Sequence, residues 1–211
     1  MARPVVLQAL LGGVVLAAAC VPYLLSQRQP QVLLLLRLVL LFPLTILLLQ
    51  ATLAWTGLAA GCEAFPRSRP LLVWLKFAVL AEVLAAVYGG VVDPALAPLQ
   101  PGYYPAGFTE WLTGLPWVVA FQPLVLVAAV FAFAVRLSGS PVAAIAAVAV
   151  IRQAAVVYHW HSLPPLSLFL LLLLAGLHGV FVAVAYRRLG YPGAVLVALL
   201  LEARFLFVLA T

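Results

Sequence analysis

Charged residues are scarce in this chain: only 8% of its 211 residues are Asp, Glu, Lys or Arg, whereas 67% are hydrophobic. A soluble domain cannot hide that much apolar surface from water, so the composition excludes a water-soluble globular protein. The net charge of +6 does not indicate nucleic-acid binding, because the positive residues are dispersed and form no basic stripe. The composition predicts one transmembrane domain, residues 1–211, with the lipid bilayer as its main partner.

Cysteine and lysine are nearly absent as well. The two cysteines, Cys20 and Cys62, cannot form a disulfide framework, and we expect them near opposite membrane faces, too far apart for a bridge. The only lysine is Lys76, so the last span has none to carry a retinal-type Schiff base. Abundant arginine, alanine, leucine and proline favour a GC-rich genome, and hence a bacterial inner membrane.

Familiar catalytic and cofactor-binding motifs are missing too. The sequence has no His-Glu-x-x-His helix, no phosphate loop and no dinucleotide fingerprint. The turn at Ser138–Ser140 lacks the Gly-x-Ser-x-Gly pattern of a nucleophile elbow. The sequence therefore identifies no standard hydrolase or nucleotide-dependent enzyme, and it names no cofactor.

Long apolar runs are what the chain does contain. Windows of about 20 residues, the length that crosses a bilayer as a helix, predict about seven spans. These spans cover residues 4–25, 31–55, 71–92, 116–136, 141–158, 166–186 and 192–210. Most of the connections between them are short and rich in proline or glycine, which end helices. The sequence thus predicts an all-α, polytopic transmembrane bundle.

The first of these runs has two interpretations. Its small residues before Cys20 resemble the cleavage site of a signal peptide. The apolar run nevertheless continues to Leu25, as it would in an uncleaved span. We therefore expect the N-terminal run to remain a membrane span.

Arginine placement predicts the orientation of the bundle. Apart from Arg28, the loop arginines fall in alternate loops, and by the positive-inside rule those loops are cytoplasmic. They are Arg67, Arg69, Arg136, Arg187 and Arg188. The N-terminus is then cytoplasmic and the C-terminus lies outside. The long segment 93–115, which has no Lys or Arg but several aromatic residues, is predicted as a non-cytoplasmic interfacial loop.

Ionisable side chains deep inside the predicted spans are the best clue to a site. They are Glu82, Arg152, His178 and Glu202, with Arg204 close to Glu202. A charge near the bilayer centre costs roughly 2.5–3.5 kcal/mol on insertion scales, so such groups usually face a partner, a cavity or a substrate path. Arg152 is expected to bond to a deep carboxylate. Glu82 fits either a neutral, hydrogen-bonded packing residue or an ion or proton site.

Spacing limits which of these groups can meet. Glu202 and Arg204 are two residues apart, so we expect them not to pair within one helix. His178 is flanked by Gly176 and Gly179, which would let another helix approach closely.

Histidines offer a candidate metal or haem site. His159 and His161 lie where the fifth span ends; they would point apart in a helix and share a face in extended backbone. With His178 they form the candidate ligand set. The alternative is that these histidines are interfacial or packing residues.

Two segments in the last third of the chain, residues 141–210, carry motif-like patterns. In the first, an apolar helix ends with Val157 and, four residues later, His161. The second joins the Gly-rich stretch 176–179 to the turn Tyr186–Gly190 and a last apolar span. Together they resemble the core of the CAAX-protease/bacteriocin-processing family of intramembrane enzymes, with its Phe-x-x-x-His motif, Gly-rich helix and Tyr-Arg-Arg-x-Gly turn. Val157 stands where that family has Phe.

The chain departs from the family at the residues to which activity is attributed. The family's Glu-Glu-x-x-x-Arg motif, which activates water, has no counterpart in this chain. Gln122 lies near the expected place without an acid beside it. The family's last helix carries His-x-x-x-Asn, whereas the last span of this chain has Glu202–Phe205 there. Without paired carboxylates there is no evident general base. The resemblance implies a divergent member that is not a standard protease, with His161, His178 and Glu202 as candidate catalytic residues.

Three functional hypotheses arise from these residues. The first is the altered CAAX-protease-like protein. The second is an accessory membrane subunit, bound to other membrane proteins, or a small transporter. Its structural, ion or proton site would comprise Glu82, Arg152, Glu202 and Arg204. The third is a haem- or metal-binding membrane subunit that uses His159, His161 and His178.

Overall fold

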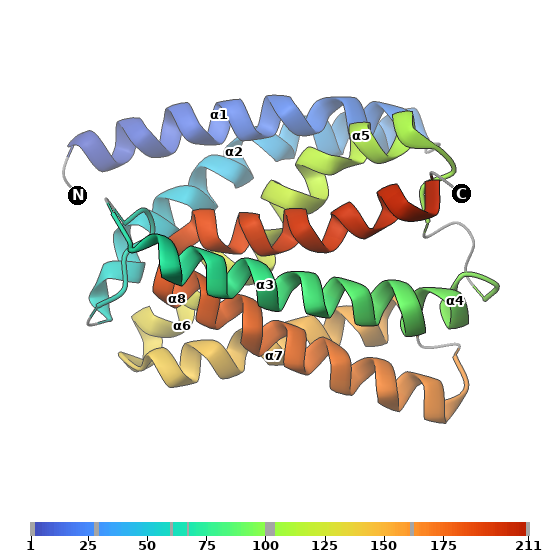
Figure 1. Ribbon diagram of the computed structural model, residues 1–211. Coiled ribbons are helices and arrows are strands. Elements are labelled where there is room, and N and C mark those ends of the chain that lie inside the picture. The colour runs from blue at the N-terminus through green and yellow to red at the C-terminus, as the bar shows by residue number, and fades with distance from the viewer. Residues whose placement is uncertain are drawn as a thin grey trace.

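Helices build all of the regular structure in the computed structural model, which describes residues 3–27, 30–59, 61–66, 68–99, 104–160 and 163–209 (Figure 1). These ranges contain no strand, which confirms the prediction of an all-α fold. Within them, six helices are long and apolar enough to cross a membrane.

The first two predicted spans form a helical hairpin. Helix α1 (Arg3–Ser26) continues without interruption past the small residues that resembled a cleavage site. Helix α2 (Gln31–Trp55) ends in a 3-10 turn, Thr56–Leu58. The two helices pack closely at Gly13, where a Cβ would lie only 2.7 Å from Cγ1 of Ile46.

The third span is longer than the sequence suggested. Helix α3 (Leu71–Val87) passes through a π-helical turn, Tyr88–Val92, directly into α4 (Asp93–Leu96). Asp93 was predicted as the first residue of an interfacial loop, and this is wrong: it is helical and buried. The paired glycines and Pro94 look like helix-ending signals, but the π-helical turn absorbs them.

The fourth span also begins earlier than predicted. It runs without a break from Phe108 to Ser138. It comprises α5 (Phe108–Pro116), two π-helical turns (Trp117–Phe121 and Leu124–Ala129) and α6 (Val130–Ser138). The segment predicted as one loop, 93–115, is therefore helical at both ends. Proline inside a helix removes a backbone hydrogen bond, and the widened π-helical turns beside Pro116 and Pro123 accommodate that loss.

The last two helices, α7 (Pro141–Trp160) and α8 (Pro165–Leu209), pack along each other. Gly190 interrupts α8 with a non-helical backbone, φ 68° and ψ −162°. The chain reverses there, so the two arms of α8 run in opposite directions, and the two ends of the chain lie at opposite ends of the bundle (Figure 1).

Gly190 is required on two grounds. Its positive φ is unfavourable for a residue with a Cβ. A Cβ at this position would also lie 2.5 Å from the carbonyl oxygen of Ala64. The next residue anchors the reversal, because the backbone amide of Tyr191 donates to the same Ala64 oxygen at 2.7 Å.

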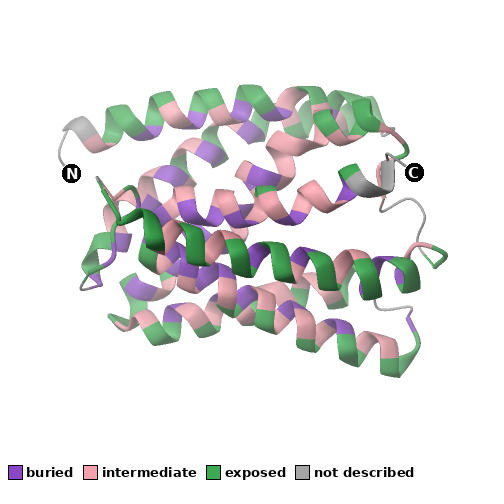
Figure 2. Cartoon of the chain, in the orientation of Figure 1, coloured by how far each residue is buried: buried purple, intermediate pink, exposed green. Residues whose placement is uncertain are grey.

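The parts of α8 on either side of the reversal lie in the main hydrophobic core. Tyr186, at the end of the first arm, is fully buried, and its hydroxyl lies 2.7 Å from Thr56 Oγ1. Cys20 and Cys62 are buried as free thiols in two separate apolar clusters. In contrast to these buried residues, the outward side of α3 is largely exposed (Figure 2).

Candidate polar site between the helices

An ion pair between Asp93 and Arg204 forms the centre of the polar site. The Arg204 Nε atom donates to Asp93 Oδ2 at 2.8 Å. Both side chains are largely buried: that of Arg204 is 10% exposed and that of Asp93 is 8% exposed. Arg204 Nη1 also donates to the carbonyl oxygen of Leu201 at 2.6 Å. The π-helical turn of α3 brings Asp93 to the pair, and the reversal at Gly190 returns Arg204 beside it.

Aromatic rings enclose this ion pair. The Arg204 guanidinium lies over the Phe205 ring, 4.1 Å from its centroid, and 5.5 Å from that of Tyr88. The Tyr104 hydroxyl donates to Asp93 Oδ1 at 3.3 Å. The rings restrict water and add cation–π attraction, so the pair is held in an environment that strengthens it.

Glu202 lies at the edge of the same group. Its Oε1 atom is 3.9 Å from Arg204 Nη1, which is within ion-pair range but beyond hydrogen-bond distance. The expectation that Glu202 and Arg204 would not pair is therefore wrong, because the long arginine side chain reaches back along its own helix. The close partner of Arg204 is still Asp93. The backbone carbonyl of Glu202 accepts a hydrogen bond from Trp111 Nε1 at 3.2 Å, which ties α5 to α8.

A second polar pair joins α7 to the first arm of α8. Arg152 Nη2 lies 3.0 Å from His178 Nε2 and 3.3 Å from Nδ1. A guanidinium only donates, so the ring nitrogen that it contacts must accept, and the imidazole is neutral. The helices come close at Gly179, where a Cβ would lie 2.7 Å from Cα of Ala149. The bond expected between Arg152 and a carboxylate stays a prediction.

Tyr88 connects the two pairs. Its ring meets the His178 ring edge to face at 6.1 Å between centroids, and the Arg204 guanidinium lies over the same tyrosine ring. We call these side chains the polar cluster: Tyr88, Asp93, Arg152, His178, Glu202 and Arg204. The cluster contains two carboxyl and two guanidinium groups, so its formal charges cancel if both acids are ionised.

Glu82, also predicted as a midplane residue, lies outside the polar cluster. It is exposed on the outward side of α3. Among the residues that the structure describes, its carboxylate has no hydrogen bond and no ion pair. The structure therefore brings Arg152, His178, Glu202 and Arg204 into one region and leaves Glu82 apart.

The two histidines that the structure describes, His159 and His178, do not share a metal site. His159 is exposed at the end of α7 and packs its ring against Tyr158, while His178 contacts Arg152. His161 lies outside the described residues. Over the described part of the chain, no group of three His, Cys, Asp or Glu side chains could hold a metal ion. A site that includes His161 stays a prediction.

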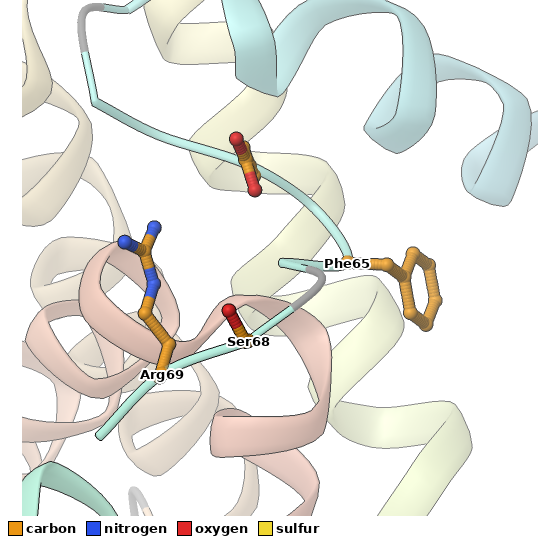
Figure 3. A pocket seen from close by; sticks show the side chains of 4 residues that line it. Phe65, Ser68 and Arg69 are labelled. Carbon is orange, nitrogen blue, oxygen red and sulfur yellow. The ribbon is translucent and has the colours of Figure 1, made fainter.

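A separate hollow of about 430 Å³ lies in the loop between α2 and α3 (Figure 3). Its lining residues are all exposed: Glu63, Phe65, Ser68 and Arg69. Phe65 points away from Ser68 and Arg69. The hollow thus offers a shallow, polar surface with no enclosed binding volume.

Cys62, buried beside this loop, is a poor nucleophile. Burial raises the pKa of its thiol, and the neighbouring Arg187 and Arg69 guanidiniums oppose that effect without cancelling it. A thiol with a raised pKa stays protonated at neutral pH, and only the thiolate reacts. The loop therefore holds a structural cysteine.

The sequence missed Asp93, Tyr88 and Tyr104. Asp93 follows Gly89 and Gly90 and precedes a proline, a pattern typical of a helix end. A tyrosine near the end of a span, such as Tyr88, is typical of an interfacial residue. No local signal marks the contact between Asp93 and Arg204, which are 111 positions apart.

Comparisons with known proteins identify no relative. No protein-family model matches the chain, and neither any curated protein nor any solved structure does. A function for this chain must therefore be argued from the polar cluster and the exposed Glu82.

Proposed function

We propose that this chain is a non-proteolytic, CAAX-protease-like membrane protein of a bacterial inner membrane, and that it works as an accessory subunit. In this proposal the polar cluster holds the helices in register and performs no hydrolysis. The proposal rests chiefly on one observation: Arg204, in the helix where the protease family carries His and Asn, is closed onto Asp93 at 2.8 Å.

A closed ion pair is poorly suited to activating water. A general base needs a carboxylate or imidazole free to take a proton. Here Asp93 is neutralised by Arg204, and His178 receives a hydrogen bond from Arg152. Each of these contacts joins separate helices, α3–α4 to the second arm of α8 and α7 to the first arm. The contacts favour a structural role.

Seven membrane crossings are part of the proposal. The reversal at Gly190 divides α8 into two arms, each about the length that spans a bilayer. The two arms supply two crossings, and with the other five spanning helices they make seven. With the loop arginines cytoplasmic, an odd number of crossings leaves the N-terminus inside and the C-terminus outside.

The CAAX-protease resemblance receives support from the same reversal. The segment Tyr186–Gly190, which resembles the family's Tyr-Arg-Arg-x-Gly turn, lies where the first arm of α8 ends and the chain turns back. The last apolar segment then returns along the bundle, as a final helix of such a core would.

Two measurements test this function. Purified protein in detergent is incubated with a fluorogenic prenylated CAAX peptide; we expect no turnover above that of an H178A/E202A variant. Hydrolysis that disappears in this variant would show a working protease. Native gels of mild-detergent extracts from the source membranes test the accessory role: we expect a complex larger than the chain produced alone in a foreign host. Equal sizes would overturn it.

A further inference from the structure

The outward side of α3 carries an acid where a lipid-facing helix should be apolar. Glu82 is the twelfth of the 26 residues in the span Leu71–Leu96. Exposed residues surround it on the same helix side, since positions three, four or seven apart share a face. We call this surface the α3 outer face: Leu75, Val79, Glu82, Ala86 and Gly90, all exposed (Figure 2).

Glu82 cannot avoid the bilayer core by itself. It lies about 17 Å from the start of the span at 1.5 Å per residue, and its side chain is too short to reach the interface. The polar cluster faces inward and satisfies its own charges. Lys76 is six residues nearer the helix start, where its long stem reaches the interface. The described chain thus supplies no counter-charge for Glu82.

The surface beside Glu82 permits a second helix to come close. Ala86 and Gly90 follow it at intervals of four and carry little or no side chain. A Cβ added at Gly90 would meet no heavy atom within 4 Å, so the backbone there is uncovered. Small residues at such intervals allow transmembrane backbones to approach, and a polar side chain then gains a short interhelical hydrogen bond.

A second copy of this chain does not complement the surface. Subunits related by a two-fold axis along the membrane normal would set Glu82 against Glu82 at equal depth. Among the described residues, the exposed cations of the chain's own spans lie near helix ends or beside the reversal at Gly190: Arg37, Lys76, Arg136 and Arg188. Charge complementarity therefore favours a different protein whose helix brings a positive group to this depth.

We propose that the α3 outer face binds a transmembrane helix of a partner protein that carries lysine, arginine or histidine near its middle. That side chain pairs with Glu82, and the helix backbone packs over Ala86 and Gly90. The inference rests on the proposed accessory function and specifies its partner by chemistry.

The test uses the full-length chain, reconstituted in phosphatidylcholine vesicles, and labelled Leu/Ala transmembrane peptides. One peptide has a central lysine and its control has leucine there; a central position has the same depth in either orientation. Energy transfer between chain and peptide reports binding. We expect the lysine peptide to bind E82Q about 3- to 30-fold more weakly than the unmodified chain, the range given by measured interhelical hydrogen bonds.

Two further variants make the result specific. G90L places a bulky side chain on the packing surface. It should weaken binding of the lysine peptide while leaving the chain folded. E63Q, which removes an exposed acid in the loop before α3, should bind as the unmodified chain does.

Several outcomes would overturn the proposal. If the unmodified chain binds the lysine and leucine peptides equally, charge has no role. The same conclusion follows if E82Q binds the lysine peptide as tightly as the unmodified chain does. Self-association of the chain that depends on Glu82 would make a second copy the occupant. If peptide binding fails while native gels still show the larger complex, only the docking surface is wrong. If the peptide binds but the native complex is absent, the accessory function is wrong.

Discussion

Glu82 and Asp93 are two acids eleven residues apart on one continuous helical segment, and their surroundings are opposite. Asp93 is 8% exposed and paired with Arg204 at 2.8 Å. Glu82 is exposed and has no counter-charge among the described residues. An inward carboxylate stabilises its own chain, whereas an outward one within a span contributes only once something outside the chain meets it.

The largest effect is expected from breaking the inward pair. D93A removes the closest ion-pair partner of the largely buried Arg204; breaking a buried pair costs up to about 3–5 kcal/mol, and Glu202 at 3.9 Å offsets part of that cost. We expect a markedly lower unfolding temperature in detergent, measured by tryptophan fluorescence. The double variant D93A/R204L removes both charges and should recover most of the loss. E82A is the matched control; if it destabilises the chain as much as D93A, the contrast between the two acids fails.

The reversal at Gly190 should have the next largest effect, because it returns Arg204 to the end of α3. G190A combines an unfavourable positive φ with a 2.5 Å contact to the Ala64 carbonyl, together about 2–4 kcal/mol. G139A is a control for positive φ alone, since Gly139 has φ 66° and ψ −1°, with open space around it. We expect it to cost about 1–2 kcal/mol. Equal losses in chemical denaturation would deny any role to the Ala64 contact.

The Arg152–His178 contact is expected to contribute less. H178A removes one acceptor from a partly buried guanidinium, at a cost of up to about 1–3 kcal/mol. H178N supplies a carbonyl oxygen in its place and should restore part of the stability. Because Arg204 contacts a different partner, D93A and H178A should be nearly additive. A strong coupling in the double-mutant cycle would mean that Tyr88 links the two pairs energetically.

The sequence predicted the fold better than the site, for a physical reason. Apolar runs report bilayer crossing directly, so helices such as α1, α2 and α7 match their predicted ranges within a few residues. Proline is ambiguous: the predicted fourth span begins at Pro116 and passes through Pro123, whereas in the structure the helix begins at Phe108 and π-helical turns carry it past both prolines. That ambiguity explains the late predicted start of the fourth span.

The site was predicted only in part. Arg152, His178, Glu202 and Arg204 stand out because charge is rare inside an apolar run. Their partners depend on which helix faces they occupy and on the reversal at Gly190, and neither can be read from depth along one span. The difference between Glu82 and Asp93 is of this kind, since both are simply acids in an apolar segment.

The smallest effect on stability, and the sharpest contrast, is expected from neutralising each acid with its amide. E82Q removes a charge that no described group compensates, so the isolated chain should change by no more than about 0.5 kcal/mol. D93N removes the charge that offsets Arg204 and should be clearly destabilising. Thermal unfolding of both variants in the same detergent, repeated in source membranes, separates the two roles. In membranes E82Q should additionally lose the larger native complex, because Glu82 acts there on a partner, whereas its fold in detergent should be unaffected.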